Sequence, residues 1–371
     1  MSNPIAPSPS RKSMVLLSRL LLSTAFSEPS GDAKTSFVDS ELLNIGREEF
    51  SQLVALANSN HVIVRGLEKF AEAMRARKDP EREHWAQEAL GTERTRIGNA
   101  VRFLRSICAA LEEEGHDAVV IKSLDHWPDL GSDLDLFTPA APEAVLDLMK
   151  RRFDAKLAAR SWGDRLARKW NFLLPGLQEA VEIHIGRLGQ TGEQTVLASL
   201  VARRARQIQI DGVPFRVPHV SDRLMISALQ RMYRHFYFRL CDIVDSAALI
   251  ESGAIDYEDL EDAATAAGIW EGMATYLLIV ADYVSQYRGS GPNLPNAVAS
   301  TARFGGETIF YSKEFLRVPI LPQSAGLYGS QLGGLLRKGE LESTMRLGLL
   351  PALAGVALVG QKITGSDKGI W

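Results

Sequence analysis

The segment 118–137 constrains the fold of this chain more than any other. A β-branched run leads to Lys122 and Ser123, a turn rich in proline, glycine and serine follows, and the segment ends in Asp133-Leu-Asp-Leu-Phe137. This order predicts a strand, a turn and a second strand. Successive side chains of a strand point to opposite faces, so Asp133 and Asp135 are expected together on one face of a sheet whose other face is apolar.

A second alternating strand is predicted at Val181-Glu-Ile-His-Ile185. Its apolar residues belong on a buried face, and Glu182 and His184 belong on the opposite one. It follows residues 169–174 across a Pro-Gly turn, which predicts a hairpin. If both acidic strands lie in one sheet, Glu182 can face the aspartate pair.

Neighbouring carboxylates repel each other unless a cation lies between them, and this arrangement suits Mg²⁺, or Mn²⁺ in its place. Three carboxylates on one sheet face can hold two ions about 3.5–4 Å apart, the spacing used for in-line displacement at phosphorus. Asp133, Asp135 and Glu182 are therefore the candidate catalytic and metal-binding residues.

These motifs resemble those of the DNA polymerase β-like nucleotidyltransferase superfamily, and especially its bacterial branch of largely uncharacterised nucleotidyltransferases. The resemblance is carried by Lys122-Ser123, by Asp133 with Asp135, and by Glu182-Ile-His184, and it extends over roughly residues 14–284. Ser123 departs from the branch, which has a glycine in this turn. The fold is predicted to be α+β: a small mixed β-sheet core at residues 94–217, flanked by helical regions at 1–93 and 218–371.

The resemblance implies transfer of a nucleoside monophosphate (NMP) from a nucleoside triphosphate (NTP) to an unidentified small-molecule or protein acceptor, with release of pyrophosphate. It implies metal binding by Asp133, Asp135 and Glu182, of which Glu182 also draws off the acceptor proton. The candidate nucleotide-binding residues are Lys122, Ser123, Gly131, Ser132, His184, Arg231, Arg234 and His235.

Arg231, Arg234 and His235 belong to a helical region predicted from Asp222 to Leu249, where they fall at positions i, i+3 and i+4. Two interpretations stay open. Either they form a positive wall over the triphosphate, or the helix packs in the core and its arginines extend their charged ends to solvent.

Three alternatives to a nucleotidyltransferase remain. An Asp-x-Asp strand can be an ordinary surface strand, it can bind the metal of a glycosyltransferase that uses a nucleotide-sugar, or the chain can be a non-catalytic relative that binds a nucleotide or a partner. A phosphatase of the haloacid dehalogenase type is disfavoured, because a turn and not an apolar strand precedes Asp133.

The composition limits the kinds of binding partner that are expected. The 371 residues carry a formal net charge of −3 and a pI near 6.2. A protein that follows a nucleic-acid backbone usually shows a basic footprint, so no nucleic-acid partner is expected. Cys108 and Cys241 lie in apolar helical patterns and are predicted to be buried thiols, without a cysteine-rich metal site.

The two ends of the chain carry apolar stretches. Residues 11–26 resemble a signal peptide in their basic start, but leucines at helical spacing favour a packed first helix, and a cytoplasmic location is expected. Residues 1–13 and 28–36 are predicted to be a loose terminus and a linker. The apolar stretch 347–360 is too short to span a bilayer and is expected to pack on the body or to make a weak peripheral membrane contact.

Overall fold

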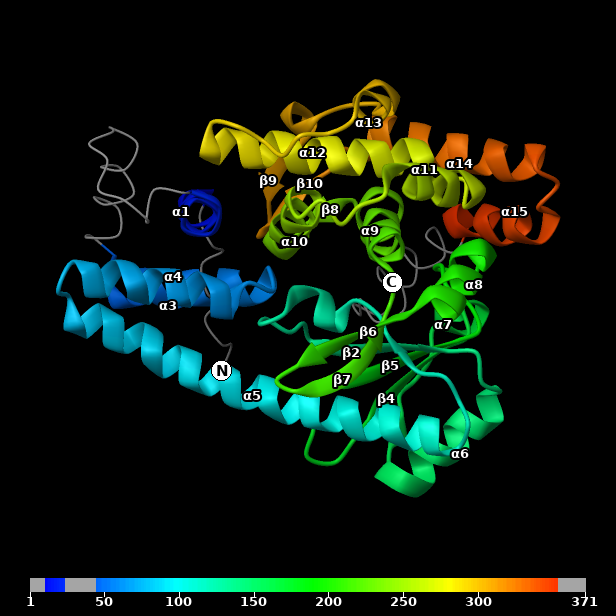
Figure 1. Cartoon of the computed structure of the whole chain (residues 1–371), viewed down its shortest axis with the longest axis horizontal. Helices are drawn as coiled ribbons and strands as arrows, with labels where there is room; N and C mark the ends of the chain where they lie inside the picture. The colour runs from blue at the N-terminus through cyan, green and yellow to red at the C-terminus, as the bar shows by residue number, and fades with distance from the viewer. Residues whose placement is uncertain (1–10, 24–44, 353–371) are drawn as a thin grey trace, which may run out of the picture. The chain divides into compact units, whose positions relative to one another are not determined.

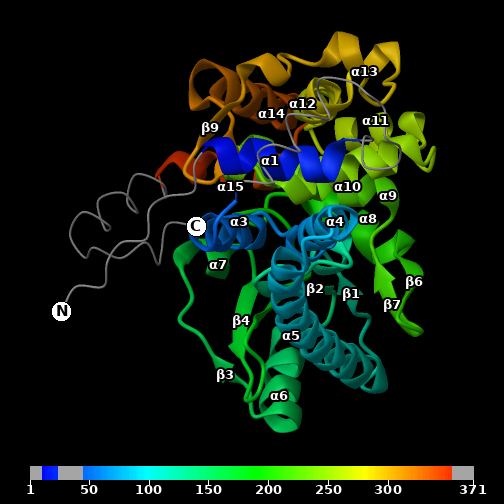
Figure 2. The same cartoon turned by 90° about the vertical axis from the view of Figure 1, so that its left-hand side faces the viewer.

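The computed structural model describes residues 11–23 and 45–352, and its fold is α+β, as predicted (Figure 1 and Figure 2). The predicted linker at 28–36 and residues 1–10 lie outside the described residues. Contacts divide the chain into two compact units. Unit 1 comprises residues 1–95, 236–254 and 274–320, and unit 2 comprises residues 96–235, 255–273 and 321–371.

The units do not follow the three predicted regions along the chain. The first boundary, at residue 95, falls close to the predicted one at 93, but the predicted C-terminal region 218–371 is shared between both units. The elements that contain a boundary are α5 (Pro80–Glu113), α12 (Trp270–Arg288) and η4 (Ile320–Ser324).

Unit 1 is mainly helical. Leu16, Leu17 and Leu20 are buried and pack α1 against α3 and α4, which confirms the predicted packed first helix. The short strands form one sheet in the order β8-β10-β9. The elements of unit 1 are α1 (Arg11–Leu22), α3 (Arg47–Ser59), α4 (Ile63–Ala76), β8 (Tyr237–Phe238), α10 (Leu240–Glu251), α13 (Asn296–Thr301), η3 (Gly306–Thr308), β9 (Phe310–Ser312) and β10 (Phe315–Arg317).

Unit 2 is built on a five-stranded mixed sheet in the order β1-β2-β5-β4-β3, in which β2 and β5 are parallel and the other pairs antiparallel. The predicted hairpin is therefore present as β4 and β5. The elements of unit 2 are β1 (Val119–Val120), η1 (Ser123–His126), β2 (Asp133–Thr138), α6 (Pro142–Phe153), β3 (Lys156–Leu157), α7 (Trp162–Leu166), β4 (Lys169–Leu173), β5 (Ala180–Ile185), α8 (Thr195–Arg204), β6 (Arg206–Ile210), β7 (Val213–Val217), α9 (Val220–Ala228), η2 (Leu229–Arg234), α11 (Tyr257–Ala266), α14 (Ala325–Arg337) and α15 (Leu341–Gly348).

The two faces of this sheet differ as the alternation predicts. Leu134 and Leu136 of β2 lie beside Val181 and Ile183 of β5, and all four side chains are fully buried. Figure 1 and Figure 2 both show α5 and α6 alongside the sheet. Burial of one apolar face fixes the register, because a shift by one residue would turn the acidic side chains into the core.

The predicted continuous helical region from Asp222 to Leu249 is wrong. Helix α9 ends at Ala228 and continues as the π-helix η2, and the chain then enters the short strand β8 before α10 begins. The break occurs at Phe236, whose φ of 55° is incompatible with a right-handed helix. Strand β8 pairs with β10, which comes much later in the sequence.

In the part of the chain that the structure describes, no helix combines the length and the apolar character needed to cross a bilayer. Of the predicted apolar stretch 347–360, only residues 347–352 are described, and α15 ends at its start. Cys241 is buried, as predicted, whereas Cys108 is only partly buried.

Candidate functional site

Strands β2 and β5 bring two acids together on the polar face of the sheet. Asp135 lies directly beside Glu182 in the parallel register, and two residue pairs further on His184 lies beside Phe137. The ligand atoms of Asp135, Glu182 and His184 all lie within 4.8 Å of one another. His184 Nε2 is 2.8 Å from Glu182 Oε1 and 3.9 Å from Asp135 Oδ1. The sequence predicted that His184 shares a strand face with Glu182 and binds the nucleotide; in the structure its ring also lies close to Asp135.

Asp133 lies at the edge of this group. It is the exposed first residue of β2, and Ser132 Oγ donates a hydrogen bond of 3.3 Å to its carboxylate. Desolvation by the surrounding chain and repulsion from Asp135 and Glu182 raise the pKa of Asp133. The three predicted carboxylates therefore interact electrostatically, but His184 and not Asp133 completes the compact group.

Two lysines balance the charge of these acids. Lys122 Nζ forms an ion pair with Asp135 Oδ1 and lies 3.5 Å from Glu182 Oε1. Lys169 Nζ lies 3.0 Å from Glu182 Oε2 and 3.1 Å from Asp164 Oδ1. Burial alone would raise the pKa of Glu182, but Lys122, His184 and Lys169 together hold it well below its usual range. Burial opposes the charge of Lys169, yet Glu182 and Asp164 raise its pKa.

Ser123 acts on the backbone of β2. Its Oγ accepts a hydrogen bond of 2.7 Å from the Asp135 N–H and donates one of 3.2 Å to the Asp133 carbonyl. The side chain is buried, so its hydroxyl positions the acidic strand. Of the predicted phosphate-binding pair, Lys122 reaches the acids with its side chain, and Ser123 holds the strand that carries them.

The turn with Gly131 and Ser132 is fixed by a residue that sequence reasoning missed. Arg96 of α5 donates hydrogen bonds to the carbonyls of Leu130, at 3.0 Å, and Gly131, at 3.3 Å, and pairs with the buried Glu179. Leu130 and Gly131 precede β2, and Glu179 directly precedes β5. Arg96 therefore holds together the starts of the two acid-bearing strands.

The predicted basic cluster has a different geometry from the one expected. Arg231 and Arg234 belong to the π-helix η2, where the i, i+3 and i+4 spacing of an α-helix does not apply, and His235 follows its end. Arg231 is buried, and Arg234 Nη2 lies 3.6 Å from the buried Glu193 Oε1. These contacts support the packing interpretation for Arg234.

Lys169 and Asp164 were missed as well. In the β4–β5 hairpin Lys169 lies opposite His184, so the alternation that placed Glu182 and His184 on one face also places Lys169 there. The hairpin register was the signal that could have found it. Asp164 lies at the start of the short helix α7, where it accepts from the Ser161 N–H at 2.9 Å, and no periodicity relates it to the sheet.

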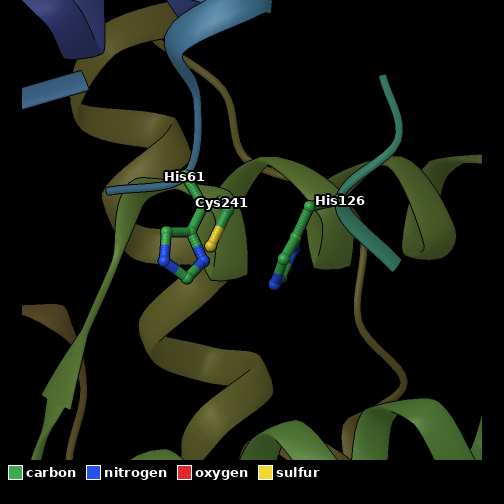
Figure 3. A group of neighbouring side chains, drawn as sticks. All are labelled: His61, His126 and Cys241. Carbon is green, nitrogen blue, oxygen red and sulfur yellow. The ribbon is translucent and has the colours of Figure 1, made fainter. Parts of the chain in front are cut away.

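Two further potential metal ligands lie side by side in unit 1 (Figure 3). The imidazole of His61 lies beside the thiol of Cys241, with ligand atoms within 4.8 Å. Asn60 explains their proximity, because its Oδ1 accepts from the Leu240 N–H at 3.0 Å and its carbonyl accepts from the Cys241 N–H at 3.2 Å. His126, drawn with them, belongs to unit 2. Two ligands are fewer than zinc sites use, so the pair is not a metal site by itself.

No protein-family model and no curated protein matches this chain. Its function is therefore inferred from the geometry of the group on the sheet. Two carboxylates and an imidazole converge there, and such a donor set can bind Mg²⁺ or Mn²⁺, with the imidazole favouring Mn²⁺. The carboxylates already surround a cation, the ammonium group of Lys122, so the site is arranged for positive charge.

Proposed function

We propose that this chain is a metal-dependent nucleotidyltransferase that moves an NMP group from an NTP to a small-molecule or protein acceptor and releases pyrophosphate. The observation that carries the proposal is the placement of Asp135 beside Glu182 on adjacent parallel strands, with His184 in the same group. The resemblance of these strands to the DNA polymerase β-like nucleotidyltransferases supports it, as does the fit of the donor set to Mg²⁺ or Mn²⁺.

Asp135, Glu182 and His184 would hold the metal, and Asp133 lies at the exposed edge of this group. The bound metal would neutralise phosphate charge and lower the pKa of the acceptor hydroxyl. The acceptor oxygen bonds to the α-phosphorus, the bond from this phosphorus to the bridging oxygen breaks, and pyrophosphate leaves with the electron pair. A carboxylate of the group would accept the acceptor proton, and Glu182 keeps the role that the resemblance implies for it.

The remaining residues position the reactants. Lys122 supplies a point charge next to the carboxylates, and Arg96 and Ser123 fix the strands that carry them. Reactions of this kind depend mainly on positioning and electrostatics, so few further groups are required. Nucleoside triphosphates are cytosolic, and we therefore propose a cytoplasmic enzyme.

Incubation of the protein with each labelled NTP and Mg²⁺ tests the proposal through pyrophosphate release and labelling of the protein or of added acceptors. Asp135→Asn should reduce pyrophosphate release by at least about a hundredfold, since even partners of metal ligands contribute ten- to a hundredfold. Asp147→Asn, the same change at an exposed carboxylate of α6, is the matched control and should leave turnover unchanged.

Three results would contradict the proposal. If the protein released pyrophosphate from none of the NTPs, it would be a non-catalytic relative. Near-normal turnover by Asp135→Asn would show that the metal site is wrongly assigned. Release of a nucleoside diphosphate from a nucleotide-sugar, without pyrophosphate, would instead identify a glycosyltransferase.

A further inference from the structure

The backbone at Lys122 has an unusual conformation. Its φ of 64° and ψ of −55°, with a hydrogen bond of 2.7 Å from the Ser123 N–H to the Ile121 carbonyl, form a γ-turn of the positive-φ kind. This turn is rare and strained for a residue with a side chain, and glycine would adopt it at less cost. Strain of this kind persists only where the surrounding structure enforces it.

The neighbouring residues enforce the turn. The Ile121 N–H donates to the Asp135 carbonyl at 3.0 Å, and the buried hydroxyl of Ser123 bonds to the backbone of both Asp133 and Asp135. The residues on both sides of Lys122 are thus bound to the acidic strand β2. Lys122 itself is the point at which the chain turns, and its side chain extends from there to the carboxylates.

The ammonium group lies where a metal would bind. It contacts Asp135 Oδ1 and Glu182 Oε1, and these are the two oxygens that also approach His184 Nε2, at 3.9 and 2.8 Å. A divalent ion held by Asp135, Glu182 and His184 needs the same oxygens. Lys122 Nζ and such an ion therefore cannot occupy the site together in this arrangement, since both carry positive charge.

Lys169 differs from Lys122 in this respect. It contacts the other oxygen of Glu182, Oε2, and shares its charge with Asp164. An ion bound through Glu182 Oε1 would leave both contacts of Lys169 intact. Only Lys122 has to move.

We propose that Lys122 is a tethered cation that occupies the metal position in the metal-free protein and that a divalent ion must displace. The inference rests on the metal site of the proposed function, but it concerns the affinity for the ion and not the reaction. Competition for the same carboxylate oxygens weakens metal binding, and removal of the competitor strengthens it. The ammonium keeps Asp135 and Glu182 from repelling each other until the ion arrives.

Calorimetric titration of the metal-free full chain with Mn²⁺ alone tests the proposal. Lys122→Met should lower the Kd for Mn²⁺ by about ten- to a hundredfold, within the usual range for interacting ligands. Lys122→Arg retains the charge and should stay close to the wild-type Kd. Lys150→Met removes an exposed lysine of α6 and is the control that should not change it. Lys122→Gly keeps the positive φ without strain and serves if the methionine variant does not fold.

Mn²⁺ binding by the Lys122 variants with no detectable binding by the wild type would also support the proposal. A Kd for Lys122→Met and Lys122→Gly equal to or weaker than that of the wild type would overturn it, and so would the absence of Mn²⁺ binding in all of these proteins. Turnover of an NTP with an unchanged Mn²⁺ affinity would overturn this inference alone. Tightened Mn²⁺ binding without turnover of any NTP would overturn the proposed function alone.

Discussion

Two of the groups of ion-paired side chains in unit 2 are built in different ways. One is the sheet group, which comprises Asp133, Asp135, Glu182, His184, Lys122 and Lys169. The other is the arginine network of α8, α9 and α11, in which Arg204 donates to both carboxylate oxygens of Asp222 at 2.7–3.1 Å and to Asp259 at 2.6 Å. Ser221 completes the network by donating to the other oxygen of Asp259 at 2.7 Å.

The difference lies in the cation. The planar guanidinium group of Arg204 matches the carboxylate of Asp222 in a fixed geometry. The lysines of the sheet group are point charges, which another cation can replace without a matching shape. An arginine network of this kind joins helices, whereas a lysine-balanced group can exchange its cation.

Glu182 of the sheet group and Asp222 of the network also respond differently to their surroundings. Burial raises the pKa of Asp222 even though Arg204 opposes it, whereas the partners of Glu182 outweigh burial and lower its pKa. Glu182 has Lys122, Lys169 and His184 around it, whereas the arginine network supplies Asp222 with one cation, Arg204. The sheet group therefore stabilises the charge of Glu182 more strongly than the network stabilises the charge of Asp222.

The largest expected effect on stability belongs to the arginine network. Arg204→Met leaves Asp222 buried without its charge partner, and loss of one member of a buried pair lowers the free energy of unfolding by about 3–5 kcal/mol. Urea unfolding at pH 7 with EDTA measures this loss of stability. Arg151→Met is the control, because Arg151 is exposed and solvent screens its ion pairs. A loss below 1 kcal/mol for Arg204→Met would contradict the structural role of the network.

A smaller loss of stability is expected when Lys169 is replaced. Lys169→Met removes two charge-assisted hydrogen bonds, to Glu182 and Asp164, and should lower the free energy of unfolding by about 1.5–3 kcal/mol. Mg²⁺ should recover part of this loss, because an ion bound by Glu182 replaces the missing charge and binds only the folded state.

Arg204→Met serves as the comparison for this rescue. Mg²⁺ should stabilise Arg204→Met no more than it stabilises the wild type. Equal recovery in both variants, measured by urea unfolding with and without Mg²⁺, would show that the two groups do not differ in cation exchange.

Part of the sheet group could be predicted from local patterns. The alternation of acidic and apolar residues gave the two strands, and burial of the leucine and isoleucine face then required Asp135 and Glu182 to share the other face. The same rule, applied across the hairpin, would have placed Lys169 with them. The two-residue alternation of a strand is enough to predict which face these residues occupy, because successive side chains of a strand always point to opposite faces.

The rest depends on features that a local pattern does not encode. The direction of the Lys122 side chain follows from a positive φ, which sequence propensities assign to glycine and not to lysine. The residues of η2 have the composition of an ordinary α-helix, so the sequence does not reveal the π-helix. Arg204, Asp222 and Asp259 come from three helices and meet only through tertiary packing. The break at Phe236 depends on a strand partner almost eighty residues further along the chain.

The dependence of stability on pH in acid distinguishes Glu182 from Asp222. The folded pKa of Glu182 lies below its unfolded value of about 4.3, so its ionised form contributes stability that is present above about pH 4.3 and is lost as the pH falls through the folded pKa. Asp222 has a raised folded pKa, and protonating it recovers stability as the pH falls.

With EDTA present, Glu182→Gln should therefore flatten the loss of stability below about pH 4.3, and Asp222→Asn should steepen the net fall in acid. Urea midpoints from pH 7 to pH 3 measure both. The same change of slope in the two variants would contradict the opposite pKa shifts on which the comparison rests.

The smallest effect concerns Asp133, where the sheet group is open to solvent. The pKa of its carboxyl is raised by desolvation and by the repulsion of Asp135 and Glu182, so the ionised form destabilises the metal-free fold at neutral pH. Asp133→Asn should raise the free energy of unfolding in EDTA by less than about 1 kcal/mol, because solvent screens an exposed charge. The gain should vanish below the unfolded pKa of about 3.9, where both states are protonated. With Mg²⁺ the sign should reverse, because the ionised carboxylate of Asp133 then attracts the bound ion, whereas Asp147→Asn should change neither value. A loss of stability for Asp133→Asn in EDTA would mean that its neighbours stabilise this carboxylate in the folded state. The distinction between an exchangeable and a structural group would then not extend to Asp133.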